Sequence, residues 1–584
     1  MSDANLLFTV TSAALLMALV AWVSYQKTKG TVDTAEGYFL AGRGLTGVFI
    51  AGSMLLTNLS AEQLIGLNGS AYGFNMSSMA WEVTAGFAII IMALVFLPRY
   101  LAGAFTTLPE FLKNRFDDDV RRMTVVLFLL GYGLITIPSV LYSGSLAVLR
   151  LFNVPALTGM SFGESLVVTI VGIGVIGSIY AVFGGLRAVA VSDTINGIGL
   201  LIVGLMIPYF GLMALGDGHF FAGVSTIVTE NTHKLNAVGS DSDPTPFGTL
   251  FTGMIFANLF YWGTNQYVIQ RTLGAKSLAE GQKGVMLTGF FKLFVPILML
   301  IPGVIAFHMY GPGLATIDLA YPQLVADVLP VYLSGFFLAV LLGAVFSSFN
   351  SLLNSAATLF TLDVYAPLAK KKISDAKLIR IAKIASIVIA LLSFVVAPLL
   401  ARAPEGLWQI IRIFTGFYNI PIIAVVIIGL FAHRVPALGA KIAIVFHVIA
   451  YGTLKFIWVV DINFIHIYAI LFAIEVAIML AVGYWRPLSI PAKGKTAPAV
   501  DMTPWKYSVP VAIILVAAIT AQYIIFSPIG VVGGVGSDFW MAITALLLVT
   551  LLATRRALSH WQGKYQHSLA FKLSKDSHPH QERP

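Results

Sequence analysis

The chain has 584 residues, of which 58% are hydrophobic and only 11% are charged, and its formal net charge is +9. This composition excludes a soluble chain of several domains and indicates a polytopic membrane protein. Because there is no cysteine, the chain has no disulfide framework, thiolate metal site or cysteine nucleophile, and redox and zinc chemistry are not expected.

Apolar runs of about 20 residues predict the membrane spans. The first run is not a cleaved signal peptide, because Asp3 stands where a positive region belongs and the run is too long. The predicted fold class is therefore an all-α polytopic membrane protein with about 14 to 15 transmembrane helices. The runs are 5–25, 46–69, 78–98, 124–149, 163–184, 191–214, 247–268, 285–308, 330–361, 379–400, 407–431, 438–459, 464–484, 507–527 and 537–554.

Lysine and arginine positions predict the orientation, because cytoplasmic loops collect them. With the N-terminus outside, thirty of the 36 basic residues, among them Arg187 and Arg271, fall in inward loops or in the tail after Thr554. Only Arg150, Lys234 and Arg402 fall in outward loops. The pattern supports this set of spans and predicts a cytoplasmic C-terminal tail. It also explains the net charge without a nucleic-acid partner.

One inward loop predicts a short surface helix. Thr107 precedes Leu108, Pro109 and Glu110, which is the order of an N-cap followed by a proline in the first helical turn.

The second span carries five polar side chains in the middle of an apolar run from Val48 to Leu67. Hydrocarbon offers no hydrogen-bond partners, so these groups must face protein, water or a ligand. The segment is also a weak helix former, and an unwound turn at Leu56 to Leu59 would free carbonyl groups for a cation, as in secondary transporters. The alternative is a set of hydrogen bonds between helices. The five residues are Thr57, Asn58, Ser60, Glu62 and Gln63.

Other polar groups concentrate in a few later spans. Together, acid, amide, amine and aromatic groups suit a polyhydroxylated ligand, because sugars need paired hydrogen bonds and a flat ring to stack upon. The alternative is that Lys292 and a carboxylate form a structural ion pair. The groups are Glu82, Asp193, Asn258, Tyr261, Trp262, Asn265, Gln266 and Lys292.

The ninth span predicts a cation site. Ser347, Ser348 and Ser351 lie on one side of a helix, and facing the loosened turn they would complete an all-oxygen cage for a hard cation. Sodium suits hydroxyl and carbonyl ligands better than a divalent ion does. Packing of helices through serine is the alternative.

Three stretches closely resemble the solute:sodium symporter family, also known as the sodium/glucose cotransporter family, and in particular its bacterial sodium/galactose members. The likeness runs from about Tyr38 to Phe431, and the seventh-span motif is highly specific. The stretches are Asn58-Leu59-Ser60-Ala61-Glu62-Gln63, residues 260–272 (FYWGTNQYVIQRT), and Ser347-Ser348 followed by residues 353–363 (LNSAATLFTLD).

The resemblance implies a fold of two inverted five-helix repeats (LeuT-like) with alternating access and extra terminal helices. The implied division is 1–45 for an N-terminal outer helix and cytoplasmic loop, 46–214 for the first repeat, 215–246 for an extracytoplasmic loop, 247–431 for the second repeat, 432–554 for accessory helices and 555–584 for a cytoplasmic tail. The implied location is the bacterial cytoplasmic (inner) membrane.

The resemblance also implies site residues. The implied sodium ligands are the backbone of Leu56, Leu59 and Ala344 and the hydroxyls of Ser347 and Ser348, with Asp193 on the sodium exit path. The implied sugar ligands are Gln63, Glu82, Asn258 and Lys292, with Tyr261 as an inner gate. Asn58 belongs to the same substrate set. A second sodium at Asp193, Ser347, Asn350 and Ser351 is a weaker alternative, because Asn350 stands where two-sodium relatives tend to carry a hydroxyl.

The chain departs from the family pattern at three positions. Ala85 replaces a serine of the sugar transporters, Leu56 replaces a small residue, and Arg412 replaces a sugar-binding glutamine. The planar guanidinium of Arg412 suits a carboxylate or sulfate, which predicts an anionic or sulfated sugar or a uronate. A permanent pair of Arg412 with Glu62 or Glu82, or an orientation toward water, remains open.

The sequence therefore predicts a sodium-driven symporter that imports a sugar or sugar derivative, a monomer or weak homo-oligomer in lipid and not an enzyme. The alternative within the family is a symporter for a carboxylate or amino-acid-type solute such as proline or pantothenate. A membrane enzyme such as a lipid-linked glycosyltransferase is disfavoured, because its acidic pairs or metal motif would lie in interfacial loops, whereas the polar groups here lie within spans.

Overall fold

The computed structural model describes residues 3–28, 34–314, 316–369, 373–402, 407–458, 460–488 and 498–577. This described part is built from helices, with two isolated β-bridges, Leu45 with Ala275 and Ser277 with Asp501. Within it, 11 helices are long and apolar enough to cross a membrane, or up to 13 when two bent helix pairs are each taken as one span. The prediction of an all-helical polytopic membrane protein is confirmed.

Two of the fifteen predicted spans, 163–184 and 247–268, do not appear among the up to 13 helices described as long and apolar enough to cross a membrane. The segment 247–268 forms two short helices on either side of a break, α14 (Gly253–Gly263) and α15 (Gln266–Leu273). The segments 163–184 and 191–214 lie in one assigned helix, α12 (Phe162–Leu215), so the loop predicted around Arg187 is wrong. Nothing is described for the side chains of residues 179–185. No proline interrupts Leu186 to Asn196, so the backbone can stay helical there.

The N-terminal half contains the first broken span. A bend of 58° separates α3 from α4. The helices are α1 (Asp3–Thr28), α2 (Ala35–Leu40), α3 (Gly47–Asn58), α4 (Ala61–Gly73), α5 (Met79–Val83), α6 (Ala85–Ile91), α7 (Leu97–Ala102), α8 (Leu108–Arg115), α9 (Asp118–Gly131), α10 (Ile137–Leu151), α11 (Val154–Thr158), α12 and α13 (Phe220–Thr229).

The second half contains a second bend, of 49°, between α16 and the pair α17 and α18. The helices after α15 are α16 (Leu278–Lys292), α17 (Val295–Met299), α18 (Ile301–Tyr310), α19 (Ala320–Val328), α20 (Ser334–Thr358), α21 (Ala366–Leu368), α22 (Asp375–Val396) and α23 (Leu407–Phe431).

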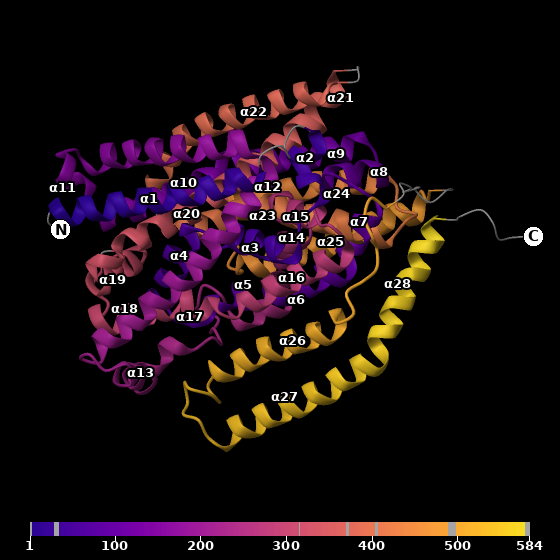
Figure 1. Ribbon diagram of the computed structural model, residues 1–584. Helices are drawn as coiled ribbons and strands as arrows, with labels where there is room; N and C mark the ends of the chain where they lie inside the picture. Colours follow the sequence, from indigo (N-terminus) through magenta and orange to yellow (C-terminus); the bar gives the residue numbers. More distant parts are fainter. Residues whose placement is uncertain are drawn as a thin grey trace, which may run out of the picture.

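Five further helices follow, and they occupy different places around the bundle. Figure 1 shows α24 and α25 within the bundle, beside α23, and α26 and α27 along its edge, with α28 leaving α27 at an angle. The helices are α24 (Ala437–Gly452), α25 (Phe464–Trp485), α26 (Ser508–Ile525), α27 (Ser537–Arg556) and α28 (Gln562–Ser577).

The centre of the bundle is formed where α3 packs against α12, α16 and α20. The side chains of α20 from Ala344 to Thr358 are buried throughout. Polar side chains on α3 and α20 therefore meet other protein groups rather than lipid, as expected for polar residues inside a membrane protein.

Candidate functional site

The break between α3 and α4 exposes backbone oxygen atoms in the middle of the protein. α3 ends at Asn58, and α4 begins only at Ala61. The carbonyl groups of Leu56 and Thr57 belong to the last turn of α3, which lacks the following intrahelical donors. The predicted break is present, but it falls at Leu59 and Ser60, so Leu56 itself is still helical.

A serine of α20 faces these carbonyl groups. The hydroxyl oxygen of Ser348 lies 3.4 Å from the carbonyl oxygen of Leu56 and 3.5 Å from that of Thr57. Ala344 and Ser347 precede Ser348 on the same helix, and both are buried. The sequence predicted Leu56 and Ser348 as one site, and the structure brings them together. It adds the Thr57 carbonyl, whereas Leu59 lies at the break itself.

Asp193 lies next to this region and interacts electrostatically with Arg271. Its carboxylate, fully buried on α12, accepts a hydrogen bond of 2.6 Å from Ser53. Ser53 in turn accepts one of 3.1 Å from the guanidinium of Arg271, which also donates to Ser351. Arg271 was predicted in an inward loop, but it lies in the helix α15 and its side chain is fully buried. Its neighbours in α15 are buried too, so this segment packs inside the protein.

A second polar network lies on the other side of the end of α3. Lys292 forms a buried ion pair with Glu82 and donates to the side-chain oxygen of Asn58. Gln63 donates to the other carboxylate oxygen of Glu82 at 3.0 Å. Four predicted substrate residues from α3, α4, α5 and α16 thus meet in one place. In this arrangement they bond to one another, and the side-chain oxygen of Gln63 is buried without a hydrogen-bond partner among the described residues. A bound solute would therefore exchange internal hydrogen bonds for its own and could pair with this oxygen.

Aromatic rings line the network. The Lys292 ammonium lies 5.3 Å from the ring centre of Trp262, and the Tyr261 ring packs edge-on against Trp262 with centres 5.1 Å apart. Asn258, one turn earlier on α14, donates to the hydroxyl of Thr84 at 3.1 Å. Asn258 and Tyr261 therefore lie on the helix that carries Trp262, but neither has a hydrogen bond to Glu82 among those described.

Arg412 approaches the network from α23. Its guanidinium lies 4.6 Å from the ring centre of Trp81, the residue before Glu82, and it interacts electrostatically with Glu62 and Lys292. Glu62 accepts a hydrogen bond from Ser139 at 3.2 Å. The site thus holds two carboxylates, Glu62 and Glu82, and two basic groups, Lys292 and Arg412, so its formal charges balance.

The backbone of α23 near Arg412 accepts hydrogen bonds from two later helices, α24 and α25. Tyr468 donates to the carbonyl oxygen of Arg412 at 2.7 Å, and Tyr451 donates to that of Ile413 at 2.9 Å. Further along α23, His447 contacts the carbonyl oxygen of Gly416 at 3.0 Å, and its other ring nitrogen contacts Glu475. No role was predicted for Tyr451, Tyr468 or His447, because contacts with backbone carbonyls leave no motif in a sequence.

The oxygen atoms of Leu56, Thr57 and Ser348 at the break after α3 suit a monovalent cation. Within the described residues, no group of three or more histidine, cysteine, aspartate or glutamate side chains could hold a metal ion. Divalent sites usually need several carboxylates. Backbone carbonyls and a hydroxyl at a helix break are instead the oxygen set that secondary transporters use for sodium.

The chain is similar to known sodium-coupled transporters. Residues 38–446 match the model of the Sodium:solute symporter family. The chain is 42% identical to "Uncharacterized symporter YidK" of Escherichia coli K12, over 95% of this chain and 96% of that protein. It is 34% identical to the "Sodium/glucose cotransporter" of Vibrio parahaemolyticus, over 74% of this chain and 81% of the relative.

A solved structure shares the fold. A Na+-coupled sialic acid symporter in a substrate-bound outward-open state superposes with a TM-score of 0.72, covering 83% of this chain and 99% of that chain at 21% identity. The prediction of an inverted-repeat transporter fold is confirmed by this match. The boundaries of the two repeats and the roles of individual residues remain predictions.

Proposed function

The chain belongs to the sodium:solute symporter family, in which sodium is the coupling ion, and from this premise we propose that it imports a sugar or sugar derivative by alternating access. We propose the bacterial cytoplasmic membrane as its location, with the N-terminus outside and the C-terminus inside, and transport rather than enzymatic catalysis as its activity. The alternative within the family is a carboxylate or amino-acid-type solute.

The observation that carries the proposal is that the last turn of α3 contacts both polar regions. The carbonyl groups of Leu56 and Thr57 face Ser348 on one side, while the side chain of Asn58 faces Lys292 on the other. A cation bound at the carbonyls and a solute bound at Asn58 would thus contact consecutive residues. Movement of this turn would change the binding geometry at both sites, and such a shared change is what couples two affinities.

The second site supports a polyhydroxylated solute. A carboxylate, an amide and an ammonium group accept and donate several hydrogen bonds in one place, and Glu82, Gln63 and Lys292 supply all three. The rings of Tyr261 and Trp262 offer an apolar surface beside them. Sugars combine hydroxyl edges with an apolar ring face, so they use both features. The relative from Vibrio parahaemolyticus, a sodium/glucose cotransporter, supports the same solute class.

Arg412 supports a narrower proposal, that the solute carries a carboxylate or sulfate. The guanidinium lies over the ring of Trp81, and the planar fork of an arginine suits bidentate contact with a carboxylate or sulfate. The interaction of Arg412 with Glu62 argues against this proposal, because the Glu62 carboxylate balances the charge of the guanidinium. A neutral sugar is therefore the competing substrate class.

Thermal-shift measurements on the purified protein test the substrate class. Neutral sugars, uronates, sulfated sugars, proline and pantothenate would be compared with and without sodium. The proposal expects a sugar-type compound to raise the melting temperature in sodium and to act far more weakly in potassium. Stabilisation by proline or pantothenate alone would contradict it and support the alternative.

A further inference from the structure

α27 and its continuation carry an apolar face that the rest of the described chain leaves uncovered. None of the hydrophobic window in the span that includes α27 is buried, and Figure 1 shows α27 at the edge of the bundle beside α26. Leu547 and Leu551 are 64% and 67% exposed. In a membrane-spanning helix such a face meets lipid or another protein.

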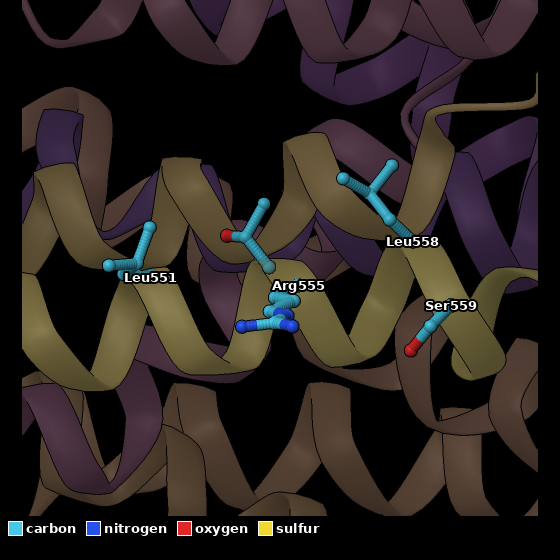
Figure 2. A pocket seen from close by; sticks show the side chains of 5 residues that line it. Leu551, Arg555, Leu558 and Ser559 are labelled. Atoms are coloured by element: carbon cyan, nitrogen blue, oxygen red, sulfur yellow. The ribbon is translucent and has the colours of Figure 1, made fainter.

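A hollow of 540 Å³ lies on this face, where α27 continues into the π-helical turn Ala557–Trp561. Figure 2 shows Leu551, Arg555, Leu558 and Ser559 following one another along the helix. Thr554 completes the lining, and its hydroxyl is buried without a hydrogen-bond partner among the described residues. The hollow thus has apolar walls, with the exposed Arg555 among its lining residues.

The charge around the hollow has one sign. From Arg555 to Lys575 the chain contains five lysines and arginines, and the first acidic residue is Asp576. Trp561, at the end of the same turn, is 42% exposed. A tryptophan next to basic residues at the end of an apolar span is typical of the membrane–water interface.

We propose that this hollow is a binding site for a membrane phospholipid with an anionic headgroup. The headgroup lies against the exposed Arg555 and Arg556 at the edge of the hollow, and an acyl chain lies against Leu551 and Leu558. Anionic lipids are attracted to basic residues at the ends of spans. The proposal concerns a face outside the transport site and does not depend on the identity of the solute.

A second copy of this chain is a poorer occupant of the same face. A two-fold contact would place this face against its own equivalent, so Arg555 and Arg556 would meet the same arginines. Like charges that face each other across an interface disfavour the complex. Charge complementarity therefore favours an anionic lipid.

The site lies close to a contact between the last helices and the transporter. Gln562 donates to the carbonyl oxygen of Trp505 at 3.0 Å and accepts from the backbone of Val509 at 2.9 Å. Tyr565 accepts from Gln282 of α16 at 2.8 Å, and α16 ends at Lys292. A lipid bound at Arg555 would thus stabilise a segment that contacts a helix of the substrate network.

Native mass spectrometry on the full-length protein in detergent tests the proposal. Phosphatidylglycerol and phosphatidylcholine with identical acyl chains would be titrated into wild type, Arg555→Gln/Arg556→Gln and the control Arg380→Gln. Arg380 is an exposed arginine of α22, and α22 lies on the opposite side of the bundle from α27 in Figure 1. Wild type and control should prefer phosphatidylglycerol. At about 1 kcal/mol for each basic residue, the double variant should bind it roughly 25-fold more weakly.

A second variant tests the hollow itself. Leu558→Trp should fill it and weaken the binding of both lipids, while the melting temperature without added lipid checks that both variants are folded. Equal affinity of wild type for the two lipids, or an unchanged affinity in Arg555→Gln/Arg556→Gln, would overturn the proposal. So would glycerol 3-phosphate binding as tightly as the lipid, or dimers whose formation excludes it.

Discussion

The hydroxyl oxygen of Ser348 lies 3.4 Å from the carbonyl oxygen of Leu56, across the contact between α20 and the last turn of α3. This pair joins the two helices at the point where α3 stops. A cation placed between them would bind the two halves of the transporter to each other, so its loss should be felt at the solute site as well.

Ser348→Ala should weaken sodium binding by about 1.5 to 3 kcal/mol, the range for hydrogen bonds to charged groups, which is roughly 10- to 150-fold. Coupling is reciprocal, so solute affinity should fall in limiting sodium and change little without sodium. Titration calorimetry at several sodium concentrations measures both. The control is Ser393→Ala, which removes a buried serine of α22 whose hydroxyl, among the described residues, donates to the Ile389 carbonyl of its own helix.

The buried pair of Glu82 and Lys292 predicts a stability effect. Lys292→Met leaves Glu82 buried without its partner, so it should destabilise the protein by about 3 to 5 kcal/mol. The double variant Glu82→Gln/Lys292→Met should recover part of this loss, yet both variants should lose solute binding. Thermal unfolding and solute titration separate the two effects.

An exposed pair provides the comparison. Lys283 and Glu280 are 2.7 Å apart, with side chains 44% and 25% exposed, so Lys283→Met should cost about 1 kcal/mol or less. If Lys292→Met destabilised the protein as little as Lys283→Met, the account of a buried ion pair would be wrong. If Lys292→Met still bound solute normally, the assignment of this network to the solute would be wrong.

Arg412→Gln distinguishes an acidic from a neutral solute. If the guanidinium binds the anion, the variant should lose an acidic or sulfated sugar by about 1.5 to 3 kcal/mol and keep the neutral analogue. Uptake of both compounds by wild type and variant makes the comparison. A wild type that prefers the neutral sugar would refute the proposed anionic group.

Tyr468→Phe tests whether α25 positions Arg412. The substitution removes the 2.7 Å hydrogen bond to the Arg412 carbonyl but no atom that faces the solute network. Solute affinity should fall by about 0.5 to 1.5 kcal/mol, and this loss should disappear in the Arg412→Gln background. Tyr523→Phe is the control, because its hydroxyl has no hydrogen-bond partner among the described residues. Equal losses in both backgrounds would contradict the positioning role.

The sequence predicted features that follow from local chemistry. Thr57, Asn58 and Ser60 weaken a helix because their side chains compete for backbone hydrogen bonds, and the chain does break directly after Asn58. Thr107 was expected as a helix N-cap, and it accepts a hydrogen bond from the backbone of Glu110. An ion pair of Lys292 with a carboxylate was the alternative to a sugar site, and the structure shows such a pair with Glu82.

Features that depend on tertiary packing could not be predicted in this way. Arg271 looks like a loop residue because it ends an apolar run, and its burial depends on Asp193, Ser53 and Ser351 from three other helices. The hydroxyls of Tyr451 and Tyr468 act on backbone carbonyls of α23. Such contacts require no particular residue at the accepting position, so no pattern in the sequence marks them.

Uptake into proteoliposomes tests the central claim most directly. One charge crossing a potential of 100 mV is worth about 2.3 kcal/mol, enough for roughly 50-fold accumulation of a solute. Liposomes containing the purified protein should accumulate a labelled sugar or sugar derivative when sodium flows inward, and Ser348→Ala should require more sodium for half-maximal uptake. Uptake driven equally well by potassium would contradict the account.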